Sequence, residues 1–211
     1  DNKSLKEENE ALKQQIAEME ATVRQGEAAS RENAFLRDLL DLRQQRRDLS
    51  DFETATVTER SVTNWTSSLT LDKGSAHGVE VGDCVIDGAG ALVGRVSRVG
   101  YNWSTVLTVV DTDTSLGARV YRTQDIGIAA GDFALMGDGL LKLDSLPASA
   151  QLLEGDLVVT SGFGGYIPPD LVIGSVTELR AEDSDTTVYA VLTPAADLAS
   201  LTEVCIIKSF E

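Results

Sequence analysis

The sequence predicts a mainly β protein with an N-terminal α-helix, in which a coiled-coil helix is followed by two small, mostly antiparallel six-stranded β-barrels. Two patterns along the chain predict this fold. Apolar residues recur at heptad spacing in the first part, whereas from Phe52 onward short β-branched segments alternate with turns rich in Gly, Asp and Asn. The chain has 211 residues, 42% hydrophobic and 25% charged, which is typical of globular proteins.

A single helix is predicted over residues 3–46, and its first three heptads carry a coiled-coil seam. The d positions hold Leu or Met, and the a positions that follow hold one Asn and two β-branched residues. The predicted seam is Leu5, Asn9, Leu12, Ile16, Met19 and Val23. An Asn at position a is tolerated opposite its own copy, so the pattern favours a parallel homodimer. Because three heptads are close to the lower limit for a coiled coil, an amphipathic helix folded back onto the head is the alternative.

The seam weakens after the third heptad. Gly26 and Ser30 occupy the next d and a positions and cannot fill a hole in a facing helix. Further on, Leu36, Leu39 and Leu40 recur at helical spacing, which predicts that the helix continues with a shifted apolar stripe on one face.

The remainder of the chain is predicted to form strands. They are short, rich in Val, Ile, Leu and Thr, and are expected at 55–60, 68–72, 83–86, 91–99, 104–110, 116–121, 126–130, 140–143, 157–160, 172–178, 187–193 and 202–209. Only residues 195–201 present another helical window. The predicted domains are a helix at 1–48, a first barrel at 52–122 with residues 178–211 as a candidate completion, and a second barrel at 123–177.

An internal repeat supports two related barrels. Segment 81–96 and segment 154–176 both read as a turn, Gly-Asp, an apolar strand, a Gly-rich connection and a strand of the pattern x-x-Gly-x-Val. Gly supplies positive φ or close approach and Asp bonds the turn, so one barrel corner is expected to occur twice. Chance similarity between Gly-rich turns is the alternative.

Charge argues against nucleic acid as a partner. The chain has 18 Lys and Arg against 34 Asp and Glu, a formal charge of −16. Residues 52–211 carry 9 basic and 22 acidic side chains, so most of the surplus lies beyond the helix. Nucleic-acid binding requires clustered basic residues to neutralise phosphates, and the sequence contains no such cluster.

Several possible sites for chemistry are weak. A hydrolase on a two-barrel fold would pair Ser161 with His77, the single histidine, but no nucleophile signature flanks the serine. The stretch from Asp111 to Arg122 opens like a calcium loop but lacks the required Gly and Glu. We therefore predict no catalytic, cofactor-binding or metal-binding residues. Cys84 and Cys205 lie in apolar runs and are expected to be buried thiols, with a disulfide between them as the alternative.

Aromatic residues in Gly-rich loops suggest a contact surface for a partner protein. Phe163, Tyr166 and Ile167 lie in the loop that ends in Pro168-Pro169, and Phe133 is a weaker candidate of the same kind. Capping of the open end of the second barrel by Phe163 and Ile167 is the alternative.

Several colinear segments resemble the MreC family of bacterial cell-shape proteins. They include residues 64–82, NWTSSLTLDKGSAHGVEVG, and residues 155–165, GDLVVTSGFGG, with further agreement at 32–40, 90–96, 103–111 and 127–131. Residues 168–171 depart from the family pattern, since Asp170 stands where the family usually has Gly. Cys84 likewise stands where small or apolar residues are commoner.

The resemblance implies a non-enzymatic dimeric scaffold of the cell-wall elongation complex. Such a protein is anchored in the cytoplasmic membrane by one N-terminal helix, with the part seen here on the outer side. It organises a penicillin-binding transpeptidase and the elongation glycosyltransferase, with MreD in the membrane and MreB filaments inside. The heptads already run at the first residue, which suggests a longer protein with a preceding anchor. Another reading is an adaptor of an envelope efflux or secretion complex, which predicts rings in place of dimers.

Overall fold

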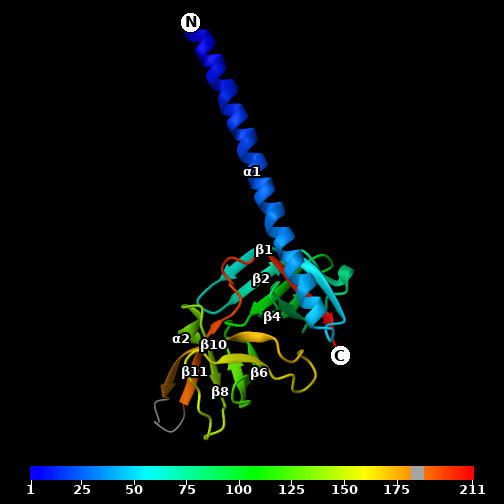
Figure 1. The fold of residues 1–211 in the computed structure, drawn as a ribbon, viewed down its shortest axis with the longest axis vertical. Coiled ribbons are helices and arrows are strands. Elements are labelled where there is room, and N and C mark those ends of the chain that lie inside the picture. Colours follow the sequence, from blue (N-terminus) through cyan, green and yellow to red (C-terminus); the bar gives the residue numbers. More distant parts are fainter. Residues whose placement is uncertain (182–187) are drawn as a thin grey trace.

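A long helix projects from a head made of two β-barrels (Figure 1). The structure, a computed structural model, describes residues 1–181 and 188–211. Helix α1 spans Asn2–Gln45, 44 residues, which corresponds to about 66 Å at 1.5 Å per residue. In the described ranges, no helix combines the length and the apolar character needed to cross a bilayer.

The first barrel closes in the order β1-β12-β3-β4-β5-β2, with every neighbouring pair antiparallel. Its strands are β1 Asp51–Val62, β2 Ser67–Leu71, β3 Cys84–Ile86, β4 Leu92–Val99, β5 Ser104–Thr108 and β12 Glu203–Ser209, with the short 3-10 helix η1 Ser75–His77 between β2 and β3.

The second barrel closes in the order β10-β11-β8-β7-β6-β9, again antiparallel throughout. Its strands are β6 Ser115–Val120, β7 Ile126–Ala130, β8 Leu141–Asp144, β9 Leu157–Thr160, β10 Val172–Ala181 and β11 Val188–Pro194. The one-turn helix α2, Phe133–Met136, follows β7 and is capped by Asp132, whose carboxylate accepts from two backbone N–H groups. The two closed antiparallel barrels confirm the predicted fold class.

The two barrels share one strand arrangement in a different chain order. When β6 to β11 are matched with β12 and β1 to β5 respectively, every neighbouring pair in one barrel corresponds to a neighbouring pair in the other. The strand that begins the second barrel is therefore matched by the last strand of the chain. The second barrel is inserted between β5 and β12 of the first.

The repeated Gly-Asp corner is confirmed. Gly82 and Gly155 have φ of 97° and 87°, and each donates its N–H to the last valine carbonyl of its repeat, at 2.8 and 2.7 Å. The carboxylates of Asp83 and Asp156 each accept the backbone N–H three residues earlier, both at 2.8 Å. The sequence similarity therefore reflects the same turn built twice.

The barrel boundaries differ from the predicted ones. The predicted first barrel, 52–122, includes the segment of β6, but β6 pairs with β7 and β9 of the second barrel, which therefore begins before residue 122. Strand β11 also belongs to the second barrel, so only β12 of the segment 178–211 returns. The physical reason is closure, because each interior strand needs a neighbour on both edges and β12 fits between β1 and β3. Residue 187, the predicted start of β11, lies outside the described residues, and residues 195–201 form turns rather than a helix.

Two buried clusters organise the head. Val85 and Ile206 point into the first barrel, whereas their neighbours Ile86 and Ile207 point outward into a second cluster. This second cluster also contains the interior of the second barrel and Leu39 of α1. Strand β3 and the central residues 204–207 of β12 are buried on both faces, which accounts for their continuously apolar sequences. The helix end and both barrels thus share one packed core.

Candidate partner-binding surfaces

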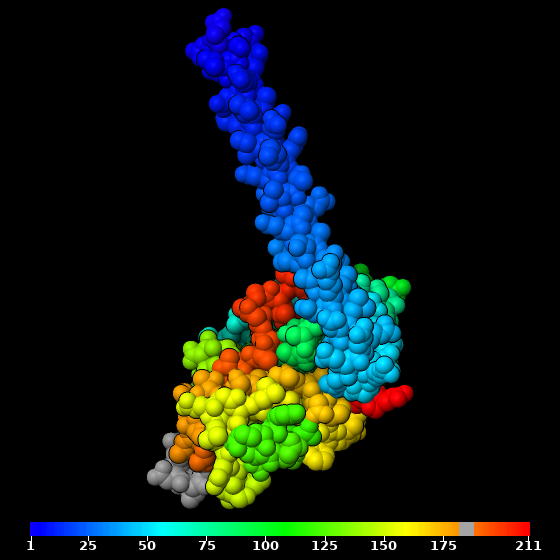
Figure 2. All heavy atoms as spheres, in the orientation of Figure 1, coloured from blue at the N-terminus to red at the C-terminus, as the bar shows by residue number. Residues whose placement is uncertain are grey.

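The predicted seam lies on the free part of α1. Its five apolar members, Leu5, Leu12, Ile16, Met19 and Val23, are each 51–63% exposed, and Asn9 is exposed among them. Figure 2 shows this part of the helix standing clear of the head. The helix is therefore not folded back along its length, and its apolar stripe lacks a partner within the described chain.

The lower end of α1 is packed onto the head. Leu39 is 6% exposed, and Phe35 and Leu42 pack against the shared core. Residues Gly88 and Gly90, in the turn between β3 and β4, leave room for the helix, because a Cβ atom there would lie 3.1 Å from Phe35 and 2.9 Å from Leu42. The helix is thereby fixed to the first barrel.

Arg46 joins the end of α1 to the second barrel. Its guanidinium donates to the carbonyl oxygens of Pro169 at 2.7 Å and Asp170 at 3.1 Å, and makes two hydrogen bonds to the Asp48 carboxylate at 2.9 and 2.7 Å. The hydrogen bond from Arg46 lowers the pKa of Asp48. The Asp170 carboxylate also pairs with Arg119 of β6. A residue that the sequence analysis did not single out thus connects the helix with the loop at 161–170.

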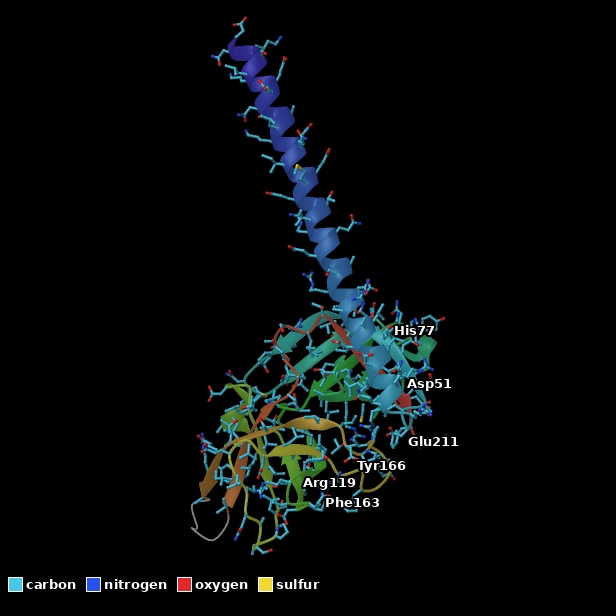
Figure 3. All side chains as sticks on the ribbon, viewed as in Figure 1. Asp51, His77, Arg119, Phe163, Tyr166 and Glu211 are labelled. Carbon is cyan, nitrogen blue, oxygen red and sulfur yellow. The ribbon has the colours of Figure 1, made fainter. Side chains whose placement is uncertain are left out.

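The loop between β9 and β10 presents the two most exposed of the predicted aromatic side chains. Phe163 is 72% exposed and Tyr166 is 79% exposed, and Figure 3 shows both at the edge of the second barrel. The loop is closed at its base by Thr160, whose hydroxyl donates to the Pro168 carbonyl at 2.6 Å and accepts from Leu171 N–H at 2.9 Å. A fixed base thus carries exposed aromatic rings.

Ile167 and Phe133 are placed differently from those two. Ile167 is half-buried and packs against the shared core, which is the capping role considered for it as the alternative. Phe133 lies on α2, where its ring meets that of Trp65 from the first barrel with centroids 5.0 Å apart. The four predicted surface residues therefore do not form one patch.

A cleft of ≈ 590 Å³ lies between the barrels. Several of its lining residues are neighbours of Trp65 or Phe133 in the sequence. The walls of the cleft include Val62 and Ser67 from the first barrel, Met136 from α2, Pro194 at the end of β11, and Leu198 from the segment that returns to β12. Trp65 was missed in the sequence because it is a single aromatic residue in a polar turn. The signal available was its position in the short turn between the two predicted strands at 55–60 and 68–72.

The turn at 100–103 carries a second exposed aromatic group that sequence reasoning missed. Tyr101 is exposed, and the ring of Trp103 lies 5.6 Å from the Arg98 guanidinium carbon. The turn is held by N–H groups of η1, which donate to the carbonyl oxygens of Gly100 and Tyr101 at 2.9 Å. Tyr101 thus offers an exposed aromatic side chain on the first barrel, distant in sequence from the loop at 161–170.

The two cysteines are free and buried. Cys84 faces Ile207 and Cys205 faces Ile86 across β3 and β12, so the thiols are diagonal rather than opposite neighbours. Diagonal neighbours are roughly 7–8 Å apart, beyond the usual disulfide range. Burial raises the pKa of each thiol to about 12. Both cysteines are therefore protonated and unreactive at neutral pH.

The structure does not assemble the hydrolase pair. The ring nitrogen Nδ1 of His77 accepts the N–H of Gly74 within its own turn, whereas the Ser161 hydroxyl accepts the N–H of Phe163. Figure 3 shows His77 beside α1 and Phe163, two residues after Ser161, lower down at the edge of the second barrel. Among the hydrogen bonds of the described residues, none joins the two side chains.

The Asp111 turn has a structural explanation. The Asp111 carboxylate is 1% exposed and accepts the N–H groups of Ser67 at 2.7 Å and Asp113 at 2.8 Å, which ties the linker between barrels to β2. Groups of three or more metal-ligating side chains are absent from residues 1–181 and 188–211.

The two corner aspartates differ in their electrostatic surroundings. Burial is the largest influence on Asp83 and raises its pKa. Arg122 makes two hydrogen bonds to Asp156, at 2.7 and 2.8 Å, and lowers its pKa. Among the ion pairs of the described residues, the corner aspartate of the second barrel, Asp156, therefore has an arginine partner, whereas Asp83 in the same turn of the first barrel has none.

Comparison with known proteins identifies the family. The family described as "Rod shape-determining protein MreC, barrel core" matches residues 57–208, which extend from β1 to β12. The chain belongs to the MreC family. The Cell shape-determining protein MreC of Listeria monocytogenes is 30% identical over 211 residues, covering 99% of this chain and 70% of that protein. The MreC protein of Escherichia coli is 32% identical over 92% of this chain, which spans only 51% of its length.

Solved MreC structures share this architecture. One described as MreC has a TM-score of 0.75 at 27% identity, covering 85% of this chain and 99% of its own. The Listeria monocytogenes MreC structure covers 97% of both chains at 28% identity, with a TM-score of 0.67. A complex between PBP2 and MreC from Helicobacter pylori shows the same fold at 18% identity, with a TM-score of 0.56 over 75% of this chain.

Proposed function

We propose that this MreC-family protein is a non-enzymatic, dimeric scaffold that organises peptidoglycan synthases outside the cytoplasmic membrane and thereby controls rod shape. The observation that carries the proposal is that one packed molecule exposes two separate surfaces. One is the apolar stripe on the free part of α1, and the other is the aromatic loop at 161–170 on the second barrel. The stripe suits a second copy, and the loop suits another protein. In this arrangement the molecule acts by holding its partners at set positions.

Dimerisation through α1 is supported by charge as well as by apolar residues. With Leu5 at d, Glu8 falls at g and Lys13 falls at e of the next heptad. In a parallel, in-register pair, position g of one chain faces the following e of the other, so Glu8 faces Lys13 of the second copy twice per dimer. The exposed Asn9 at position a favours the same register.

The transpeptidase is the proposed partner for the loop at 161–170. The Helicobacter pylori MreC structure is a complex with PBP2, which supports a penicillin-binding protein as the class of partner. Phe163 and Tyr166 are large, exposed side chains on a loop whose base is fixed by Thr160 and Arg46, and rigid aromatic anchors contribute most to protein interfaces. Preorganisation of the base lowers the entropic cost of binding.

Membrane anchoring and the remaining partners belong to the same proposal. We infer a single N-terminal membrane helix preceding α1, with the head in the periplasm or on the wall side. A structure of the major periplasmic domain of another MreC, 25% identical, supports that side of the membrane. The elongation glycosyltransferase, MreD and MreB complete the proposed assembly.

Binding assays with the full-length membrane protein test the partner assignment. Phe163→Ala together with Tyr166→Ala should weaken capture of the transpeptidase while the circular dichroism spectrum stays unchanged. Tyr101→Ala is the matched control, since it removes an equally exposed aromatic ring from the first barrel. Loss of folding in the loop variant would favour the capping role, and equal losses from loop and control would remove the loop from the interface.

Sedimentation of the same protein tests the dimer. Leu12→Asp places a charge in the seam and should convert dimers to monomers without altering the head. Ring-shaped assemblies in place of dimers would support the adaptor alternative. Labelling of Ser161 by a serine-reactive probe, lost in His77→Ala, would support a hydrolase.

A further inference from the structure

Strand β1 is longer than the edge that β12 covers. Its residues 51–56 pair with β12 along one edge, and residues 57–62 pair with β2 along the other. The chain that returns to β12 follows β1 as far as Val57, whose N–H donates to the Thr202 carbonyl at 2.8 Å. Residues 58–62 are all exposed. The end of β1 therefore has a strand partner on one edge and, within the described residues, none on the other.

The strand register shows which backbone groups face this free edge. The β1–β2 turn is closed by the Thr63 N–H, which donates to the Thr66 carbonyl at 2.9 Å. In an antiparallel ladder, hydrogen-bonded and non-hydrogen-bonded pairs alternate. Ser61 is therefore bonded to β2, and the residues on either side of it, Arg60 and Val62, direct their N–H and carbonyl groups away from β2.

The free edge borders the cleft between the barrels. Arg60 and Val62 both line this cleft of ≈ 590 Å³, and its apolar lining includes Leu69, Met136 and Leu198. Ligand pockets in proteins commonly enclose about 300–1,000 Å³, so the cleft has room for a few side chains. Unused backbone donors and acceptors thus lie next to an apolar hollow.

We propose that the edge of β1 at Arg60 and Val62 binds an extended segment of a partner protein. The segment adds a strand to the β1–β2 hairpin and places alternate apolar side chains in the cleft. Exposed strand edges are templates for such pairing, in which main-chain hydrogen bonds provide affinity and pockets for alternate side chains provide specificity. The N–H and carbonyl groups of the two residues allow up to four main-chain hydrogen bonds.

Charge around the cleft specifies the chemistry of the partner. Asp197 lines the cleft, and the exposed Asp138 lies between two glycines that line it. The basic side chain of the lining, Arg60, donates to the Leu201 carbonyl. Residues 52–211 carry a formal charge of −13. The exposed carboxylates and the acidic head therefore favour a segment that carries Lys or Arg between its apolar residues.

The site is separate from the surfaces of the proposed function. Helix α2, which contributes Met136 to the cleft, lies on the left of the head in Figure 1, whereas Phe163 and Tyr166 lie on the right in Figure 3, which has the same view. Strand pairing at β1 therefore leaves the loop at 161–170 free for a different partner.

Amide hydrogen exchange, followed by nuclear magnetic resonance on the 211-residue chain, tests the inference with defined peptides. The probe is a capped peptide of about seven residues in which Val alternates with Lys, and the control peptide has Glu in place of Lys. The Lys peptide should slow exchange at the N–H groups of Arg60 and Val62, while the N–H of Ser61 is already protected in the free protein. The Glu peptide should bind more weakly.

Two variants at one position separate strand pairing from side-chain contact. Val62→Pro removes an N–H that faces the free edge and leaves the pairing with β2 in place, whereas Val62→Ala shortens the side chain and keeps the N–H. Val62→Pro should bind the Lys peptide about tenfold more weakly than Val62→Ala, which corresponds to the loss of one hydrogen bond.

Several results would overturn the inference. One is unchanged exchange at Arg60 and Val62 in the wild type with millimolar Lys peptide, a result that does not depend on any variant folding. Equal affinity of the two peptides, or of Val62→Pro and Val62→Ala, would also do so. Protection that rises with protein concentration alone would assign the edge to a second copy instead. Capture of the transpeptidase through Phe163 is measured separately, so either proposal can fail alone.

Discussion

Arg46 is predicted to hold the loop at 161–170 against the end of α1, and Arg46→Met removes that link while keeping the aliphatic stem. The substitution deletes hydrogen bonds to the carbonyl oxygens of Pro169 and Asp170, at 2.7 and 3.1 Å, and leaves Asp48 without its cation. A hydrogen bond from a charged donor contributes about 1.5–3 kcal/mol when buried. Because the Arg46 and Asp48 side chains are 19% and 31% exposed, we expect about 2 kcal/mol for the local opening of the loop.

Hydrogen exchange of backbone amides measures this opening. The N–H groups of Asp170 and Leu171, which donate to the Thr160 carbonyl and hydroxyl oxygens, report on the base of the loop. A loss of about 2 kcal/mol corresponds to roughly 30-fold faster exchange. The matched control is Arg122→Met, which removes an equally bidentate pair elsewhere on the second barrel and should leave these amides protected.

The pH dependence provides a second readout. Because Arg46 lowers the pKa of Asp48, the stabilisation from this pair is present above the ordinary aspartate pKa of about 4 and is lost as the pH falls through the lowered value. The wild type should show this acid-induced loosening of the loop, and Arg46→Met should not. Unchanged loop exchange in Arg46→Met would refute the coupling between helix and loop.

Three further predictions concern the head and the stalk. Gly94→Ala and Gly174→Ala would place a Cβ atom 2.0 and 2.1 Å, respectively, from a carbonyl oxygen of the facing strand. Each substitution should lower the free energy of unfolding in urea by about 3 kcal/mol or more. Small effects would contradict the tight β4–β5 and β10–β11 packing. Above about pH 9, the free energy of unfolding should fall by about 1.4 kcal/mol per thiol per pH unit, because Cys84 and Cys205 ionise there only in the unfolded chain. A variant with both cysteines replaced by Ala should lose this contribution to the pH dependence. Asn9→Ile should tighten the dimer in sedimentation experiments, since it replaces a polar seam residue, and an unchanged dimer would place Asn9 outside the seam.

Much of the fold was predictable because local patterns carry it. The heptads from Leu5 onward specify a helix independently of the head, and the structure forms that helix to Gln45. The Gly-Asp corners at Gly82 and Gly155 were recognisable because a positive φ and an Asp-bonded turn leave a signature in a few adjacent residues. The aromatic residues of the loop at 161–170 were recognisable for the same reason, since Gly-rich turns seldom bury large rings.

Barrel membership was not predictable from local pattern. Strands β6 and β12 are both short segments that the sequence identifies as strands, but nothing within either segment states which barrel edge it will close. The contacts of Arg46 were equally hidden, because Pro169 and Asp170 lie more than 120 residues away in the chain. The half-burial of Ile167 was hidden as well, because it depends on how the loop folds over the core.

By itself, the sequence determined the helical stalk, the β-rich head, the repeated corner and the acidic charge of the head, because periodicity, turn chemistry and composition act over short stretches. Tertiary structure alone decided that the last strand completes the first barrel and that the head buries Leu39 of α1 while the adjacent Leu40 stays 60% exposed. These features depend on closing sheets and filling a shared core, and both are satisfied only by residues far apart in the chain.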